Sequence, residues 1–295
     1  MKNNTAEKTI TKKYRKRSPF AEIIHRLVKN RGAMVGLIIL AFIIITFFAS
    51  LFVKFESVTA TNASVRFTPP TWKYPFGTDN MGRNAFLRVV YGTRYSLAIG
   101  FGVVGIAAVI GITLGSIAGY YGGIVESIIM RFSDVLASIP GILLSMVIVT
   151  VLGQSLRNLV FAVGVTAAPG FIRITRASII TVRGNEFVEA ALAIGLSNRR
   201  IIFTQILPNG LSPIIVQISI SLGMSILIAA SLSYIGLGIP VPHPEWGALI
   251  STAREYSQFA PWLMMFPGFA IMLIVLAFNL IGDGLRDALD PKLKR

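Results

Sequence analysis

The sequence has no cysteine and few charged side chains. The lack of cysteine excludes disulfide bonds and thiolate metal sites. Only 14% of the 295 residues are charged, whereas soluble domains carry roughly 25%. Among the charged residues, the 13 acidic ones are fewer than the 28 lysines and arginines, so the net charge is +15. The basic residues flank apolar runs in blocks, a pattern that favours orientation in a membrane over binding to nucleic acid.

Long apolar runs are abundant. The mean hydropathy is +0.69 and 54% of the residues are hydrophobic. A membrane-spanning helix needs about 20 apolar residues, and six segments approach this length, which predicts an all-α, polytopic membrane protein with six transmembrane helices. The fourth segment contains Pro169, so we extend it toward Ser178 and expect neighbouring helices to enclose it. The six predicted spans are residues 33–53, 95–118, 135–152, 159–172, 211–235 and 261–281.

The distribution of lysine and arginine predicts the topology. With the N-terminus inside, 20 of the 28 basic residues fall in inner segments, so both termini are predicted to be cytoplasmic. His25 and His243 then lie on opposite sides of the membrane, and no metal site is expected. Residues 1–32 are predicted to form a basic, lipid-attracted tail and an amphipathic surface helix that begins at Pro19 and ends at Gly32. Residues 54–94 form an extracytoplasmic loop, residues 95–281 a core, and residues 282–295 a cytoplasmic tail.

Residues 181–208 are a polar insertion between two apolar runs. Arg183, Glu186 and Glu189 are expected to share one face of a short helix, and Gly195 suits a left-handed helix end. Ser197 is placed to cap a second helix, which Leu207-Pro208 is expected to end. This pattern predicts a helix–turn–helix elbow in the cytoplasm. Such an elbow either binds a partner protein or merely connects two spans.

The elbow residues resemble a known family. The pattern of Glu189, Ala190, Ala191 and Gly195, followed by Leu207-Pro208, is similar to the EAA loop of ABC importer membrane subunits, in which it forms the helix that docks on the ATPase. The chain departs from that pattern only at Gln205, where an apolar residue is usual. Further motifs resemble the second, C-type permease of the dipeptide, oligopeptide and nickel family: Phe76-Gly77-Thr78-Asp79, Gly119-Tyr120-Tyr121-Gly122-Gly123, Gly236-Leu237-Gly238 and Gly282-Asp283-Gly284-Leu285-Arg286.

The resemblance implies an architecture and a set of partners. It implies one N-terminal helix plus a five-helix importer core in the inner membrane of a bacterium. It also implies a second, homologous permease subunit, two cytoplasmic ATPase subunits and an extracytoplasmic substrate-binding protein. The chain itself has no Gly-x-x-x-x-Gly-Lys-Ser/Thr loop. We therefore expect no enzyme activity and no cofactor in this chain, with ATP and magnesium held by the partner ATPases, and no nucleic-acid partner.

Small polar side chains are candidates for the lining of a translocation pathway, because charge is scarce within the spans. Each is also suited to plain helix–helix packing. Pro213 and Gly223 are expected bending points of the fifth span, through which elbow motion would pass. The candidate lining residues are Ser145, Thr150, Gln217, Ser219, Ser221 and Ser225.

Several functions remain open at this stage. A peptide importer permease fits best, and a nickel or metal-chelate importer of the same family is the near alternative. The absence of a histidine, cysteine or methionine cluster favours peptides. An ion-coupled secondary carrier would be expected to show inverted repeats and buried acids, and a membrane enzyme a catalytic set at the end of a span. The sequence shows none of these.

Overall fold

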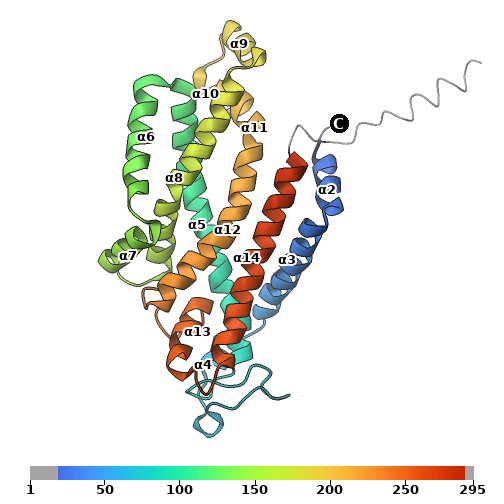
Figure 1. Ribbon diagram of the computed structural model, residues 1–295, viewed down its shortest axis with the longest axis vertical. Coiled ribbons are helices and arrows are strands. Elements are labelled where there is room, and N and C mark those ends of the chain that lie inside the picture. The colour runs from blue at the N-terminus through green and yellow to red at the C-terminus, as the bar shows by residue number, and fades with distance from the viewer. Residues whose placement is uncertain (1–18, 290–295) are drawn as a thin grey trace, which may run out of the picture.

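The computed structural model describes residues 19–289, and this part of the chain is mostly helical, without a β-sheet. Five helices are long and apolar enough to cross a membrane, and a bent pair brings the number to six when the pair is counted as one span. The all-α prediction is confirmed, and the predicted six spans match this count. α5 packs mainly along α8, α12 lies between α8 and α14, and α3 lies at the edge beside α14 (Figure 1). The spans are α3 (Arg31–Ser50), α5 (Ala85–Tyr121), the pair α6 (Gly123–Ser138) and α7 (Gly141–Leu152), α8 (Leu156–Arg183), α12 (Leu211–Tyr234) and α14 (Trp262–Leu289).

Shorter elements cluster at the two ends of the bundle (Figure 1). One end, here called the elbow end, carries α9 (Glu186–Ala193), α10 (Asn198–Arg200), the π-helical η2 (Ile201–Ile206) and α11 (Leu207–Asn209). The opposite end, here called the loop end, carries α4 (Phe55–Thr59), η1 (Ala63–Val65), α13 (Trp246–Ala253) and η3 (Arg254–Tyr256). The described part of the chain begins with α2 (Pro19–Lys29) and ends at the last residue of α14. Both of these points lie on the side of the bundle toward the elbow (Figure 1). That this side faces the cytoplasm stays a prediction from the charge count.

Two helix boundaries differ from the predictions. α5 begins at Ala85, ten residues before the predicted position, so the predicted loop of residues 54–94 ends at Asn84. The Asn84 side chain accepts hydrogen bonds from the backbone N–H groups of Phe86 and Leu87, which starts the helix there. The search for apolar runs missed the first ten residues of this helix because they include Arg88 and Arg94. α14 likewise continues to Leu289, so residues 282–289 of the predicted tail are helical.

The predicted third span, residues 135–152, is not one straight helix. It is divided between α6 and α7, which meet at an angle of 86°. The break falls at Ile139, which has extended backbone angles of φ −94° and ψ 130° and precedes Pro140. A proline disfavours the helical conformation of the residue before it. A hydropathy average carries no information about this steric effect, which is why the prediction of a single helix was wrong.

The fourth span confirms the extension past residue 172. α8 runs unbroken through Pro169 to Arg183. Half of its most apolar window is buried, against 17% for α3, and Pro169 itself is buried. The enclosure expected around a proline-containing span is therefore present.

The predicted N-terminal helix exists but ends earlier than Gly32. α2 stops at Lys29, and Asn30 caps α3 by accepting a hydrogen bond from the backbone of Ala33 at 3.1 Å. The Asn30 amide also donates to Asp287 at 3.0 Å, which joins the α2–α3 corner to the end of α14. Gly32 instead lies in the first turn of α3. The predicted basic tail, residues 1–17, lies outside the described residues.

Candidate functional site

The elbow is built around a helix-ending turn at Gly195. α9 ends at Ala193, and Gly195 has a φ of +79°, as predicted from its sequence position. The Gly195 N–H donates to the carbonyl of Leu192 at 3.0 Å, and the Leu196 N–H donates to that of Ala191 at 3.1 Å. This pair of bonds is a Schellman motif, which requires a residue that tolerates positive φ. A Cβ on Gly195 would meet nothing within 4 Å, so the position is open on its outer side.

A small apolar core fixes the elbow to the bundle. Val188 and Ala191 of α9 are buried against Ile201 and Ile206 of the second arm, and this cluster continues onto Ile179 and Val182 of α8 and Tyr120 of α5. The Tyr120 hydroxyl donates to the side-chain oxygen of Asn198 at 2.9 Å, and the Ser178 hydroxyl donates to the carbonyl of Gly210 at 2.6 Å. Packing of both arms, together with these two hydrogen bonds at the second arm, joins the elbow to the ends of α5 and α8.

Two details of the predicted elbow are corrected. Arg183 does not share a helix with Glu186 and Glu189, because α8 ends at Arg183 and Gly184-Asn185 separates it from α9. Pro208 does not end the second arm, which continues to Asn209. The arm accommodates the proline by widening the preceding turn: Leu207 donates to the carbonyl of Ile202, a π-type bond, within η2. This widening relieves the clash of the proline ring with the preceding turn.

The elbow exposes several large apolar side chains. Ile194 is 77% exposed and Phe203 is 63% exposed, with Phe187 and Leu192 also exposed. The charged Glu186, Glu189, Arg199 and Arg200 of the elbow are exposed as well. Exposed apolar side chains that form a contiguous patch are typical of protein interaction surfaces. Ile194 and Phe203 were not singled out from the sequence, because the elbow also holds other large apolar residues, such as Ile201 and Ile206, that are buried.

The predicted coupling residues divide into an outer and an inner set. Glu189, Ala190, Gly195 and Pro208 are exposed and available to a partner. Ala191 is buried and Leu207 is half-buried, so these two belong to the elbow core. Ser197 precedes the second arm, but its side chain makes no capping hydrogen bond.

The predicted pathway residues do not gather at one place. Ser145 is buried and its hydroxyl lies 2.9 Å from that of Thr166, which joins α7 to α8. Thr150 bonds to its own helix at the carbonyl of Met146, and Ser219 and Ser225 are buried in α12. The Gln217 amide donates to the Ser221 hydroxyl at 3.0 Å. Lining of a pathway by any of them stays a prediction.

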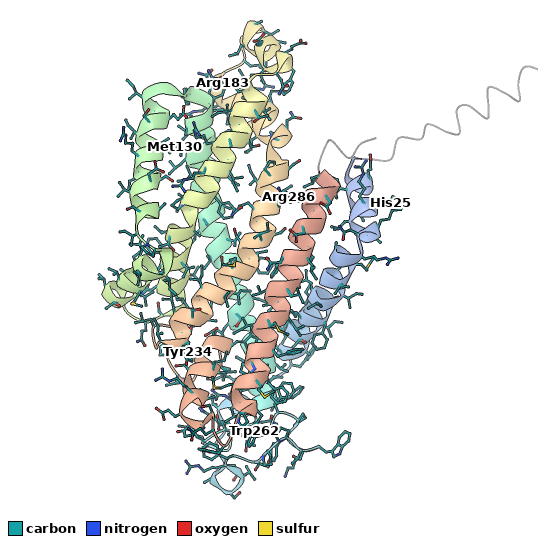
Figure 2. The ribbon with its side chains drawn as sticks, viewed as in Figure 1. His25, Met130, Arg183, Tyr234, Trp262 and Arg286 are labelled. Carbon is teal, nitrogen blue, oxygen red and sulfur yellow. The ribbon has the colours of Figure 1, made fainter. Side chains whose placement is uncertain are left out.

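Gln217 lines a groove at the elbow end. Ile174 and Ser178 of α8 form one wall of this groove, Gln217 lies in α12, and Arg286 of α14 completes it. Arg286 and Arg183 mark the elbow side of the bundle in Figure 2. The groove combines apolar walls with one amide, several hydroxyls and one guanidinium.

Pro213 and Gly223 were the expected bending points of α12. In the structure, Pro213 lies in the first turn of this helix, and Gly223 lies where the helix packs against α14. Pro213 is the third residue of α12, where a backbone N–H has no helical partner, so the proline begins the helix and does not bend it. Gly223 lies close to α14: a Cβ there would be 3.2 Å from the Cα of Val275. Its small size allows the two helices to approach closely.

Charged residues on α6 and α8 form ion pairs between the two helices. Asp134 pairs with Arg173 at 2.9 Å, and Glu126 accepts a hydrogen bond from Arg176 at 2.6 Å. Among the described residues, the Asp134 carboxylate forms its ion pair with Arg173 of α8 and not with Arg131 on its own helix. α6 places these acids beside α8, although about 40 to 50 residues separate the partners.

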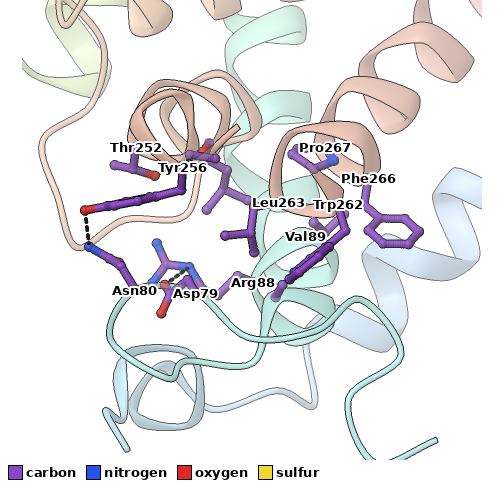
Figure 3. Close-up of a pocket in the computed structure, with 13 residues that line it drawn as sticks. Asp79, Asn80, Arg88, Val89, Thr252, Tyr256, Trp262, Leu263, Phe266 and Pro267 are labelled. Atoms are coloured by element: carbon purple, nitrogen blue, oxygen red, sulfur yellow. Dashed lines mark hydrogen bonds and ion pairs between the residues drawn. The ribbon is translucent and has the colours of Figure 1, made fainter. Parts of the chain in front are cut away.

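The loop end holds a small cavity beside a buried ion-pair cluster (Figure 3). The carboxylate of Asp79 lies 2.6 Å from the guanidinium of Arg83 and 3.8 Å from that of Arg88, which is only 3% exposed. The Asn80 amide donates to the Tyr256 hydroxyl at 3.2 Å, which joins the loop to η3. The cavity, about 30 Å³, has room for about one water molecule. The ion pairs and the Asn80–Tyr256 bond tie the loop to the bundle, and the cavity is too small to hold a peptide.

The fold defines a multi-pass membrane protein with a projecting elbow at one end, and comparison with known proteins defines its class. Residues 111–295, more than half of the chain, match the family described as binding-protein-dependent transport system inner membrane component. Residues 18–70 match the N-terminal transmembrane domain of oligopeptide transport permease C. The chain belongs to this family of transport permeases, and it is a C-type member located in the bacterial inner membrane.

Similar proteins are known from several bacteria. The chain is 50% identical to the dipeptide transport system permease protein DppC of Alkalihalophilus pseudofirmus, over 94% of this chain and 91% of that protein. It is 41% identical to DppC of Haemophilus influenzae, over 95% and 97% of the two chains. It is 42% identical to the glutathione transport system permease protein GsiD of Pectobacterium atrosepticum, over 94% and 93%.

A solved structure shares the fold of the core. An inward-facing conformation of the MetNI methionine ABC transporter matches with a TM-score of 0.56 and 20% identity, over 69% of this chain and 97% of that chain. At this identity the likeness concerns the fold alone.

Proposed function

We propose that this chain is one of two permease subunits of an ATP-driven peptide importer and forms half of its translocation pathway. The observation that carries the proposal is the elbow: its core packs onto α5 and α8, and it exposes the apolar side chains of Ile194 and Phe203. A projection packed in this way transmits displacement to the helices it is packed against. The dipeptide and glutathione permeases among its relatives support peptides as the cargo.

The proposed importer also defines the partners of this chain. Two ATPase subunits bind ATP and magnesium in the cytoplasm, and one of them receives the tip of this elbow. A second, homologous permease completes the pathway, and a binding protein delivers the peptide at the loop end. This chain contributes no ATPase activity of its own. Glu189, Ala190, Gly195 and Pro208 contact the ATPase, while Ala191 and Leu207 hold the elbow in shape.

Reconstitution tests this function. The two permeases and the ATPases are placed in vesicles with labelled dipeptide bound to the binding protein outside and ATP inside. We expect uptake that requires ATP, the binding protein and an intact elbow. Uptake of nickel or of a metal chelate, with no competition by peptide, would assign the chain to the metal branch of the family. Uptake without ATP would reject the importer assignment.

A further inference from the structure

A second concave surface, distant from the elbow, lies between α3, α5 and α14 toward the loop end. This surface, here called the edge groove, has a volume of about 620 Å³. α3 supplies Phe42, Ile45 and Ala49, and Ala270 of α14 faces them. Val89 of α5 and Trp246 of α13 form the floor. α3 and α14 lie side by side at the edge of the bundle (Figure 1).

The edge groove exists because α3 and α14 pack closely only at their elbow-end halves. A Cβ on Gly36 would be 2.9 Å from the carbonyl oxygen of Ala277, and one on Gly284 would be 2.4 Å from the Cβ of Ala33. Small residues thus allow near contact of the two backbones there. Toward the loop end the walls carry large side chains such as Phe42, and space remains between the helices.

The walls of the edge groove have no free hydrogen-bond donor for water. Its polar side-chain groups already donate to backbone carbonyls: Thr46 to Phe42 at 2.9 Å, Thr93 to Val89 at 3.5 Å and the Trp246 indole N–H to Val89 at 2.9 Å. An apolar cavity without free polar partners stays dry. If the groove were empty, the atoms that line it would have no partners for dispersion contacts on that side. An apolar occupant is therefore favoured.

The groove opens at membrane depth, and its dimensions fit a lipid chain. Phe42 and Ile45 at its rim are 61% and 67% exposed. From Phe42 to Ala49 α3 rises about 10 Å, which lies within one leaflet of about 15 Å. Val53 also lines the groove, and the exposed Lys54 directly follows it. The Lys54 ammonium group therefore lies at the end of the groove where the headgroup of a bound lipid would be.

We propose that the edge groove binds one acyl chain of a phospholipid from the leaflet at the loop end, with the lipid phosphate at Lys54. The chain fills the space between α3 and the core, and in this way the lipid holds α3 in place. The inference rests on the membrane location of the protein and is independent of its cargo and of the coupling role of the elbow.

Photolabelling of the assembled transporter tests the proposal. The complex is reconstituted in vesicles with a trace of phosphatidylglycerol that carries a diazirine on one acyl chain, and labelled peptides are identified by mass spectrometry after irradiation. We expect label on Val89 and Trp246, which are 9% and 2% exposed and are reached only from inside the groove. Phe48, 57% exposed on the outer side of α3, reports ordinary lipid contact.

Matched variants separate the groove from the general lipid surface. Ala270→Trp fills the groove, and Ala49→Phe is a second filling variant. Met272→Trp adds the same bulk at a 51% exposed position of α14 that does not line the groove. We expect the filling variants to lower the label on Trp246 at least fivefold and Met272→Trp to leave it unchanged. Label on Phe48 should stay constant in all of them.

Three results would overturn the proposal. The first is the absence of label on Val89 and Trp246 while Phe48 is labelled. The second is label on Trp246 that persists in both filling variants. The third is the loss of label from Phe42 and Ile45 in the assembled complex, which would show that another subunit covers the groove. For the headgroup, Lys54→Gln should reduce labelling by phosphatidylglycerol at least threefold, and equal labelling by a diacylglycerol probe would exclude a phosphate contact.

Discussion

The turn at Gly195 provides the sharpest test of the elbow. Asparagine and aspartate have nearly the same shape, and both tolerate positive φ better than other side chains. Gly195→Asn should therefore keep the Schellman turn at a cost of about 1 kcal/mol. Among the described residues, none but the chain neighbours lies within 4 Å of a Cβ at position 195, so the Cβ of either variant has room inside the permease. Any further effect arises in the contact with a partner.

Gly195→Asp adds a negative charge to this otherwise matched pair. If the tip is buried in a docking surface, an unpaired charge there costs about 3 kcal/mol, which weakens binding by more than a hundredfold. We expect the aspartate variant to insert into the membrane normally, to lose association with the ATPase, and to hydrolyse ATP without uptake. The asparagine variant should retain most of both activities.

The measurement compares the two variants in reconstituted vesicles. ATPase association, ATP hydrolysis stimulated by the loaded binding protein, and peptide uptake are followed together. Thermal unfolding of the isolated permeases serves as the control and should agree within about 1 kcal/mol. Equal uptake by the aspartate and asparagine variants would refute the docking of this turn.

Three further predictions address other parts of the molecule. Ile194→Ser removes the most exposed apolar side chain of the tip and should weaken ATPase association about tenfold without lowering the thermal stability of the permease; unchanged affinity would contradict a role of Ile194 in docking. Arg88→Leu leaves the half-buried Asp79 with one cation fewer, and should cost about 3 kcal/mol and speed hydrogen exchange in residues 54–84; an unaltered loop would argue against a role of the ion pairs in holding it. Dissipation of the proton gradient at constant ATP should leave uptake intact, and uptake that follows the gradient would favour a secondary carrier.

Much of the helix inventory follows from composition. Lipid cannot hydrogen-bond a backbone, so long apolar runs have few alternatives to helices. The predictions for the fifth span and for the enclosure of Pro169 depended on this constraint alone and were confirmed. The start of α5 was predicted ten residues late because a hydropathy window gives no weight to the Asn84 cap or to arginines that find partners in the loop.

Local stereochemistry accounts for the turns that the sequence predicts. Gly195 was expected at positive φ because few residues end a helix in this way, and the turn is present. The steric effect of Pro140 on Ile139 is equally local, and attention to it would have predicted the break between α6 and α7. The exposure of Ile194 and Phe203 is not local in this way, because the elbow holds other large apolar residues that are buried.

The sequence by itself determined which apolar segments form long helices, where the elbow interrupts them, and which turn ends its first arm, because these depend on neighbouring residues and on the solvent. Only the tertiary structure decided that Asp134 pairs with Arg173, that the elbow core joins α5 and α8, and that α3 and α14 leave a groove between them. These features depend on contacts between residues far apart in the chain, and no local pattern specifies the distance or the angle at which two helices meet.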